Sequence, residues 1–363
     1  MLASSALPVP LRVLVVDDSS FMQRRMAELL QRDGDVVVAG TARDGADALR
    51  RAAELRPDVI TMDIHMPRMD GLLAIEHIMR TQPRPIVVVS SFVRAGSAAA
   101  IAALEHGAVE LVQKPSEGGI SLDLALVADD LLRKVRLAAR VRVVRTARRL
   151  APPAAVARGT VSTEPSRHDP AAGETAVFIG CSTGGPAALL HLARQWRGAV
   201  LPPIVVAQHL PAEFTTELAR HMSEYSGAPV TEATDGVRPG EGRILIAPGG
   251  RHIALDSSGA LRLSRAVPTE HCVPSVDRLF ESAAAVHGAR ALGIVLTGMG
   301  NDGAAGAGAL RRAGGTVWVQ DEATSIIDGM PRAVREAGHA SHVFSLDAIG
   351  QAVAGLPLTL LRQ

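Results

Sequence analysis

Residues 11–18 of the sequence read LRVLVVDD, a short apolar run that ends on two adjacent acids. Its Val and Leu residues do not alternate with polar ones, which is typical of a strand buried on both faces of a parallel sheet. Four similar runs follow: DVVVAGTA at 35–42, PDVITMD at 57–63, PIVVVSS at 85–91 and AVELVQKP at 108–115. The segments between them have apolar residues three and four positions apart, the period of helices that cover a sheet. This alternation predicts a doubly wound α/β domain over residues 1–130.

A second series of apolar runs begins at residue 175. Its members are TAVFIGCS at 175–182, PPIVVAQHL at 202–210, GRILIAPG at 242–249, ALGIVLTGMG at 291–300 and GTVWVQDE at 315–322. Helical patterns separate several of these runs, so we expect a second, Rossmann-like α/β domain over residues 174–363. Between the domains, residues 131–173 begin with many arginines and continue rich in Ala, Pro, Ser and Thr. That composition predicts a basic helix followed by a flexible linker.

The overall composition is that of a globular protein with balanced charge. Of the 363 residues, 47% are hydrophobic, and 38 Lys and Arg balance 37 Asp and Glu. This balance leaves no overall positive charge to attract nucleic acid or a membrane surface. The two cysteines are too few for a disulfide framework or a four-cysteine zinc site, and no apolar stretch is long enough to cross a bilayer. We therefore expect a cytoplasmic protein with no nucleic acid partner and no membrane-inserted segment.

Polar side chains end four of the expected strands of the first domain. Asp17 and Asp18 follow one strand and Asp63 another, so the three carboxylates are expected at the sheet edge where such folds bind ligands. Clustered carboxylates suit Mg²⁺, and phosphate oxygens can complete the coordination shell of the ion. Ser90 and Lys114 end two further strands and would hold other phosphoryl oxygens. Each acid alone is better explained as a helix N-cap, but the five positions together favour a phosphoryl site.

The motifs VVDDSSFMQ, TMDIHMPRMDGL, VVSSF and QKP resemble those of response-regulator receiver domains, which have a flavodoxin-like fold. The resemblance implies that Asp63 is the phosphorylated aspartate and that it binds Mg²⁺ together with Asp17 and Asp18. It further implies that Ser90 is the switch hydroxyl and Lys114 the phosphate-binding lysine. A sensor histidine kinase would be the phosphodonor.

In the second domain, the run TAVFIGCSTGGP places Ser182 at a sharp turn between a strand and a helix. Such a turn exposes the serine Oγ beside backbone N–H groups of a helix N-terminus, which favour an oxyanion. The turn also fits the G-x-S-x-G pattern of serine hydrolases. The alternative is a phosphate-binding turn, because Gly180, Gly184 and Gly185 loosely match a dinucleotide loop. A lone glycine loop is weak evidence, so Ser182 is a candidate nucleophile.

A nucleophilic serine needs a base and an acid that orients the base, and the sequence offers more than one of each. His209 directly follows the strand IVVAQ, and His252 follows the strand ILIA with four residues between. Asp302 follows GIVLTGMGN, and Asp321 follows TVWVQ. A capping or core histidine without a catalytic role is the alternative for either base. Position in the sequence alone leaves four combinations open.

The motifs IGCSTGGP, VVAQHLP, ILIAPGG, PSVDRLFESAA and LTGMGNDGA resemble the catalytic domain of the chemotaxis protein-glutamate methylesterase/protein-glutamine glutaminase family. The resemblance implies that Ser182 is the nucleophile, His209 the general base and Asp302 the orienting acid. It places the oxyanion region at Thr183 and the backbone N–H of Met299. The substrates would be glutamate methyl esters on the cytoplasmic domains of chemoreceptors, hydrolysed without a cofactor. Glutamines would be deamidated by the same acyl chemistry.

With the receiver in front, the resemblance spans nearly the whole chain. It implies that the unmodified receiver blocks the catalytic site and that phosphorylation activates the esterase. Two positions depart from the family pattern. Leu111 stands where many receivers have an aromatic residue, and Val273 stands where relatives commonly have Arg before a Pro.

Three other classes of protein fit part of the sequence. A DNA-binding response regulator would use the arginines between 133 and 149 on phosphates, but it needs a helix-turn-helix where this sequence predicts buried strands. A nucleotide-binding module and a catalytically silent adaptor would each retain the predicted strands. Only the esterase would hydrolyse esters, so an assay of ester hydrolysis distinguishes it from all three alternatives.

Overall fold

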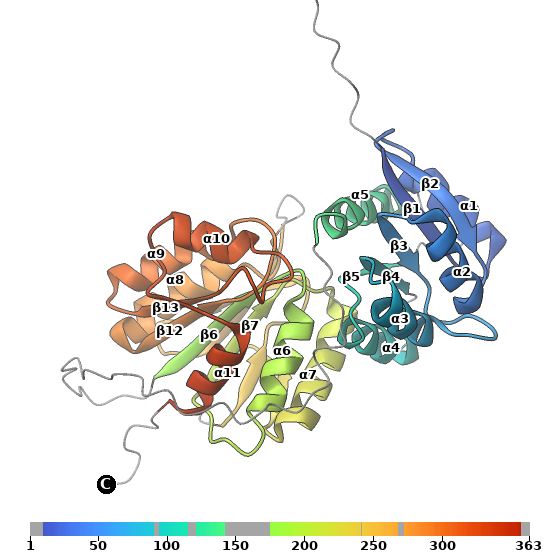
Figure 1. Cartoon of the computed structure of the whole chain (residues 1–363). Helices are drawn as coiled ribbons and strands as arrows, with labels where there is room; N and C mark the ends of the chain where they lie inside the picture. Colours follow the sequence, from blue (N-terminus) through green and yellow to red (C-terminus); the bar gives the residue numbers. More distant parts are fainter. Residues whose placement is uncertain are drawn as a thin grey trace, which may run out of the picture.

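The structure is a computed structural model, shown in Figure 1, in which two α/β units follow one another along the chain. It describes residues 10–90, 94–114, 121–141, 175–240, 242–267 and 272–356. Most of the expected linker, 131–173, therefore lies outside the described residues, and the domain boundaries remain our prediction.

The first unit is a parallel sheet of five strands in the order β2-β1-β3-β4-β5. Its strands are β1 (Leu11–Val16), β2 (Val36–Ala42), β3 (Val59–Met62), β4 (Ile86–Ser90) and β5 (Glu110–Gln113). Its helices are α1 (Ser20–Leu30), α2 (Gly45–Leu55), α3 (Gly71–Thr81), α4 (Arg94–Glu105) and α5 (Ser121–Ala138). This order confirms the predicted doubly wound fold.

Helices cover both faces of this first sheet, which explains why its strands are apolar throughout. Successive strand residues point to opposite faces. Val13 and Val15 belong to a core with α1 and α5, whereas Leu14 and Val16 belong to a core with α2, α3 and α4. The carboxyl ends of the strands therefore form a common edge that the helices do not cover.

The second unit is a parallel sheet of seven strands in the order β14-β13-β12-β6-β7-β9-β8, with a separate antiparallel pair, β10 and β11. Its strands are β6 (Ala176–Cys181), β7 (Ile204–Gln208), β8 (Val230–Glu232), β9 (Ile244–Ile246), β10 (Arg251–Leu255), β11 (Leu261–Arg265), β12 (Ala291–Val295), β13 (Thr316–Gln320) and β14 (His342–Phe344). Its α-helices are α6 (Gly185–Gln195), α7 (Ala212–Ser226), α8 (Val276–His287), α9 (Ala304–Arg312), α10 (Gly329–Glu336) and α11 (Leu346–Ala354).

The five predicted strands of this unit are the five at the centre of its sheet, and the structure adds the edge strands β8 and β14 and the antiparallel pair β10 and β11. β8 and β14 have three residues each and contain exposed polar side chains, so they lack the apolar run that marks a buried strand. Helices α6, α7 and α11 pack on one face of the sheet, and α8, α9 and α10 on the other. The cluster on the second face contains residues of this unit alone, so the unit has a core of its own.

The two units contact each other through α4 of the first and α6 and α7 of the second (Figure 1). One cluster of buried apolar residues includes Ile101 and Leu104 of α4 as well as Leu218 and Met222 of α7. At its rim, the Glu105 carboxylate accepts a hydrogen bond at 2.8 Å from the Arg194 guanidinium and one at 3.0 Å from the Tyr225 hydroxyl. The Arg194 guanidinium also lies over the Tyr225 ring, 4.1 Å from its centre.

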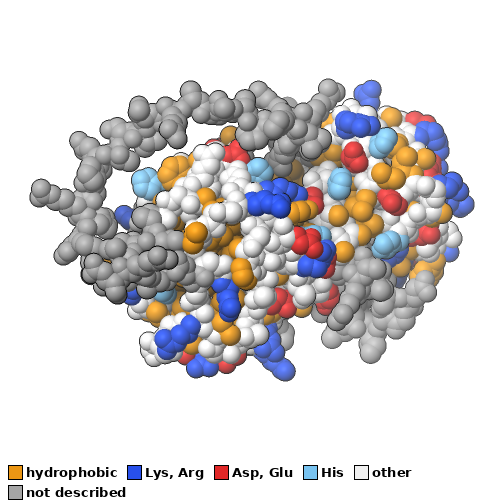
Figure 2. Space-filling view, turned by 90° about the horizontal axis from the view of Figure 1, so that it is seen from below, with side chains coloured by type: hydrophobic (Ala, Val, Ile, Leu, Met, Phe, Trp, Pro, Cys, Tyr) orange, Lys and Arg blue, Asp and Glu red, His pale blue; other side chains and the backbone are white. Residues whose placement is uncertain are grey.

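Charges on the rest of the surface are mixed in sign. On the face shown in Figure 2, basic and acidic side chains are interspersed, as the balanced composition predicts. The first basic residues of the arginine-rich segment lie on α5 and pair with acids: Arg133 and Lys134 with Asp130, and Arg136 with Asp33 and Asp35. These ion pairs disfavour a phosphate-binding role for that part of the segment. Among the described residues, no helix is both long and apolar enough to cross a membrane.

Candidate active site

Three neighbouring strands bring the predicted nucleophile, base and acid to one edge of the second sheet. Ser182 directly follows β6, and His209 directly follows β7, with Cys181 and Gln208 paired across the two strand ends. Asp302 lies in the loop after β12, which pairs with the other side of β6. The carboxyl ends of parallel strands meet at the same edge, so the strand order itself assembles the three residues.

His209 and Asp302 are in direct contact. The His209 Nε2 lies 2.9 Å from the Asp302 Oδ2, and both side chains are largely buried. This contact requires the proton of a neutral imidazole to lie on Nε2, which leaves Nδ1 as the basic nitrogen. Of the four combinations open at the sequence level, the structure brings together His209 and Asp302.

The Asp302 carboxylate rests on the N-terminus of α8. Its Oδ2 accepts from the backbone N–H of Val276 at 2.8 Å, and its Oδ1 accepts from the N–H of Asp277 at 2.9 Å and the hydroxyl of Ser275 at 3.2 Å. Burial alone would raise the pKa of Asp302, but the hydrogen bonds from His209 and from these N–H groups outweigh it and hold the pKa below its ordinary value. The acid beside His209 is therefore kept ionised.

The other two candidates occupy different places. His252 lies in β10, is buried, and its Nδ1 accepts a hydrogen bond from the Ser275 backbone N–H at 3.0 Å. Asp321 closes a turn by accepting from the Thr324 N–H at 2.9 Å and from the Thr324 hydroxyl at 2.6 Å. We interpret both residues as structural supports.

The backbone around Ser182 is held from several sides. The Ser182 N–H donates to the Thr297 carbonyl at 3.1 Å, and its carbonyl accepts from the Gly185 N–H at 2.8 Å. The Gln208 side-chain amide also donates to the carbonyls of Ser182 and His209, each at 3.0 Å. Gln208 and Thr297 lie within the motifs VVAQHLP and LTGMGNDGA, but sequence reasoning gave them no role, because the partners of a buried polar side chain at a strand end are not visible in the sequence.

Both residues of the predicted oxyanion region lie next to this turn. Thr183 follows Ser182 and is buried, and its carbonyl accepts from the Thr297 hydroxyl at 2.9 Å. Met299 lies next to Gly298, where an added Cβ would come within 2.8 Å of the Ser182 Cβ. The close approach of the two backbones therefore requires glycine at 298.

Comparison with known proteins decides the family. Residues 177–353 match the family model described as CheB methylesterase, and residues 13–120 match the response regulator receiver domain. The "Protein-glutamate methylesterase/protein-glutamine glutaminase" of Symbiobacterium thermophilum is 42% identical, over 95% of this chain and 96% of that protein. The protein of the same name from Geobacillus kaustophilus is 41% identical, over 95% of this chain and 98% of that protein. The chain belongs to the protein-glutamate methylesterase/protein-glutamine glutaminase family.

A solved structure also resembles the second unit. The "Thermotoga maritima CheB methylesterase catalytic domain" is 34% identical to this chain and covers 51% of it and 100% of its own length, with a TM-score of 0.49.

The receiver of this family member brings its predicted acids together at the edge of the first sheet. One carboxylate oxygen from each of Asp17, Asp18 and Asp63 lies within 4.8 Å of the others. The Lys114 Nζ lies 2.7 Å from the Asp17 Oδ2 and 2.8 Å from the Asp63 Oδ2. Three converging carboxylates fit a hard divalent cation such as Mg²⁺. Ser90 ends β4, paired with Gln113 of β5, and its side chain lies outside the described residues.

Burial and charge determine the protonation of this acidic site. Burial raises the pKa of Asp17, and the nearby Lys114 ammonium only partly opposes that rise. Burial would lower the pKa of Lys114, but hydrogen bonds to Asp17 and Asp63 outweigh it and raise the pKa. The Lys114 ammonium therefore pairs with two of the three acids.

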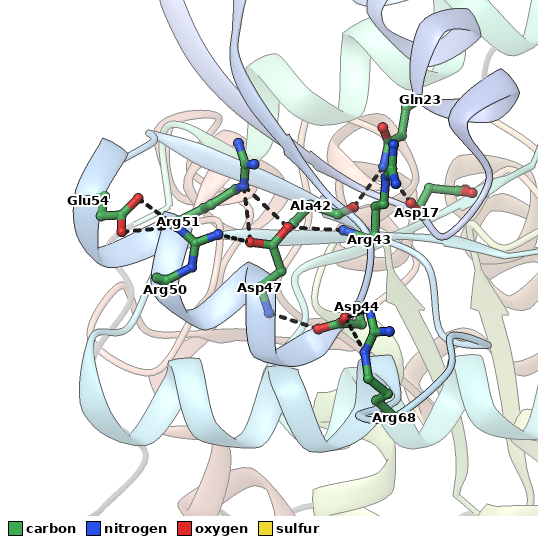
Figure 3. Close-up of polar contacts among 10 residues, drawn as sticks. All are labelled: Asp17, Gln23, Ala42, Arg43, Asp44, Asp47, Arg50, Arg51, Glu54 and Arg68. Atoms are coloured by element: carbon green, nitrogen blue, oxygen red, sulfur yellow. Dashed lines mark hydrogen bonds and ion pairs between the residues drawn. The ribbon is translucent and has the colours of Figure 1, made fainter.

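Polar side chains to which the sequence analysis gave no role fix the position of Asp17 and the neighbouring loop (Figure 3). The buried Gln23 amide donates to the carbonyls of Asp17 at 2.7 Å and Ala42 at 3.0 Å. Asp44 caps α2 and accepts from the Arg68 Nε at 2.7 Å. Arg68 has a positive φ of 66° in the loop between Asp63 and α3, so this ion pair holds the loop that follows the phosphorylation candidate.

A contact between the two units reaches the active site of this family member. Glu110, the first residue of β5, accepts a hydrogen bond at 2.5 Å from the hydroxyl of Thr183. No sequence motif marks Glu110, because its partner belongs to the other unit. The receiver thus occupies the neighbourhood of Ser182.

Proposed function

We propose that this protein is a phosphorylation-activated serine esterase that demethylates glutamate methyl esters on chemoreceptors and deamidates selected glutamines. The observation that carries the proposal is the His209–Asp302 contact at 2.9 Å, made by residues that follow the two strands on either side of the strand before Ser182. A base fixed by a buried acid beside a half-buried turn serine is the arrangement that activates a hydroxyl for acyl transfer.

In the proposed reaction, the Nδ1 of His209 takes the proton of Ser182 as the Oγ attacks the ester carbonyl carbon. The tetrahedral oxyanion is stabilised by donors at Thr183 and the Met299 N–H. The imidazolium then gives its proton to the oxygen of the departing methoxide, which leaves as methanol, and water hydrolyses the remaining acyl-enzyme to glutamate. Asp302, kept ionised on the α8 N-terminus, stabilises the imidazolium and fixes its tautomer. Deamidation follows the same steps with ammonia as the leaving group.

Control would come from the receiver. Asp17, Asp18 and Asp63 would hold Mg²⁺, which neutralises charge on the incoming phosphoryl group. Phosphorylation of Asp63 adds up to two negative charges, around which Ser90 and Lys114 rearrange. The rearranged receiver would no longer fit against α6 and α7, and the catalytic edge would open.

The partners follow from the same proposal. The phosphodonor would be a sensor histidine kinase, and the substrates would be methylated cytoplasmic domains of chemoreceptors. Both would be met in the cytoplasm.

The decisive experiment measures methanol release from methylated receptors of the same cell, with and without a phosphodonor. We expect release from the full-length protein that increases on phosphorylation. No release under either condition would refute the enzyme and favour a silent adaptor.

A further inference from the structure

The receiver places one acidic side chain at the catalytic turn. The Oε1 of Glu110 accepts from the Thr183 hydroxyl at 2.5 Å, and the other oxygen lies 3.2 Å from the Leu111 backbone N–H. Thr183 directly follows Ser182 and precedes Gly184, the N-cap of α6. A carboxylate is favoured near a helix N-terminus for the same reason that an oxyanion is.

The chemistry of this side chain matches the chemistry of the proposed product. Ester hydrolysis leaves a glutamate γ-carboxylate beside the nucleophile, and Glu110 brings a glutamate γ-carboxylate to the residue next to Ser182. We propose that Glu110 is an internal product analogue: the receiver inhibits the enzyme by filling the glutamyl subsite with its own glutamate. This inference rests on the proposed function and specifies how that same site is regulated.

The position of Glu110 links inhibition to the phosphorylation site. Glu110 begins β5, and Lys114 follows the end of the same strand, with its Nζ 2.8 Å from the Asp63 Oδ2. Leu111 is buried, and its carbonyl accepts from the Lys134 Nζ of α5 at 2.6 Å, which ties the strand to the receiver. A shift of Lys114 toward a phosphoryl group therefore acts on the strand that carries the glutamate.

The contacts between the two units allow occupation of the subsite by Glu110 to be distinguished from steric blocking of the active site by the whole receiver. The Glu105 contacts with Arg194 and Tyr225 and the apolar contacts of α4 do not involve Glu110. Removing the Glu110 carboxylate should empty the subsite while the two units stay together. A small reagent then reaches Ser182, although a receptor remains excluded.

The first test uses an alkyl fluorophosphonate, which forms a bond between phosphorus and an activated serine Oγ with loss of fluoride. We compare unphosphorylated full-length wild type, Glu110→Ala and the matched control Glu76→Gln, an exposed acid on α3. Glu110→Ala should label at Ser182 about tenfold faster than wild type, because a hydrogen bond to a charged group is lost. The control should match wild type.

X-ray scattering of the same proteins distinguishes an emptied subsite from a released receiver. An unchanged radius of gyration in Glu110→Ala, together with faster labelling, supports the inference. Equal labelling rates of Glu110→Ala and wild type would overturn it. A larger radius of gyration in Glu110→Ala would also overturn it, because Glu110 would then serve to hold the two units together. No Ser182 labelling in any protein, phosphorylated or not, would instead overturn the proposed nucleophile and this inference with it.

A second test asks whether the side chain at position 110 lies within reach of Ser182. Glu110→Gln replaces the carboxylate with an amide, the group that the proposed glutaminase activity attacks. The Ser182 Oγ would displace ammonia from this amide, and water would then release the acid. Mass spectrometry should show conversion at a rate independent of protein concentration and abolished by Ser182→Ala. A persistent amide, in a preparation whose phosphorylated form releases ammonia from receptor glutamines, would overturn the inference.

Discussion

Asp302 and Asp277 cap each other's helices: Asp302 accepts hydrogen bonds from the start of α8, and Asp277 accepts hydrogen bonds from the start of α9. Asp302, just before α9, accepts from the N–H groups of Val276 and Asp277 at the start of α8. Asp277, in the first turn of α8, accepts from the N–H groups of Gly303 at 2.9 Å and Gly306 at 2.7 Å, at the start of α9. The exchange locks the acid beside His209 to two helix termini.

The first prediction concerns Asp302. Asp302→Asn keeps the shape of the side chain but loses the charge that stabilises the imidazolium, so we expect kcat to fall by about 10⁴-fold, less than in Ser182→Ala. Asp321→Asn is the matched control and should be nearly neutral, because an amide oxygen can still accept from Thr324. Turnover of both variants tests the ranking, and an Asp321 variant slower than the Asp302 variant would contradict the triad.

The same carboxylate predicts a pH dependence of stability. Because the pKa of Asp302 is lowered in the folded protein, ionised Asp302 stabilises the fold above the ordinary aspartate pKa of about 3.9. This contribution is lost as the pH falls through the lowered value. The difference in Tm between wild type and Asp302→Asn should therefore be largest near neutral pH and shrink in acid. A difference that grows on acidification would contradict the sign of the shift.

The nucleophile and base give the next prediction. Ser182→Ala and His209→Ala should each lower ester hydrolysis by about 10⁴-fold or more with the fold intact, because the remaining oxyanion donors cannot replace them. His252→Asn is the control, since an amide oxygen can replace the ring nitrogen that accepts from the Ser275 N–H. Initial rates with circular dichroism test the set. Severe loss in the His252 variant with normal activity in the His209 variant would show that the base is misassigned.

Asp17 predicts a pH limit on Mg²⁺ binding. Its pKa is raised, so a proton competes with the metal at a pH where an ordinary aspartate is already ionised. Below that raised pKa, the Kd for Mg²⁺ should increase by about tenfold per pH unit for one competing proton. Calorimetric titration at a series of pH values measures this. A Mg²⁺ affinity that starts to fall only near the pKa of free aspartate, about 3.9, would contradict the raised pKa of Asp17.

The ion pair between Arg194 and Glu105 should stabilise the inactive arrangement of the two units. Arg194→Ala removes the contact with Glu105 and the stacking on Tyr225, and half-exposed pairs of this kind contribute about 0.5–1 kcal/mol. We expect the basal activity of the unphosphorylated enzyme to increase by about two- to fivefold. Arg197→Ala, which removes an exposed arginine just after the end of α6, is the control. Salt should narrow the difference between Arg194→Ala and wild type, and a salt-independent difference would argue against a charge effect.

Removal of the receiver tests its inhibitory role as a whole. The second unit has its own core, so a fragment that begins near Gly173 should fold and hydrolyse methylated receptor faster than the unphosphorylated full-length protein. A small phosphodonor with Mg²⁺ should activate the full-length protein and leave both Asp63→Asn and the fragment unchanged. A fragment that is no faster, with Asp63→Asn still responding, would refute inhibition by the receiver.

The sequence predicted both folds because buried parallel strands are apolar along their whole length, as in β1 and β6. It also predicted which strand ends carry the site residues, because Asp17, Asp63 and Ser182 directly follow such strands. It left the choice between His209 and His252 to family resemblance, since only tertiary structure shows which histidine meets Asp302. Glu110 escaped prediction because its partner lies in the other unit.

The apolar cluster that joins α4 to α7 makes the inactive state sensitive to temperature. Opening would expose Leu104, Leu218 and Met222 to water, with a positive change in heat capacity. Hydrophobic attraction weakens on cooling, so the closed arrangement is held less firmly in the cold than in warmth. The unmodified enzyme would then be least restrained at low temperature, where every chemical step is also slowest. Warming would strengthen closure and also speed catalysis, and because these two changes act on the basal rate of receptor demethylation in opposite directions, that rate would depend only weakly on temperature.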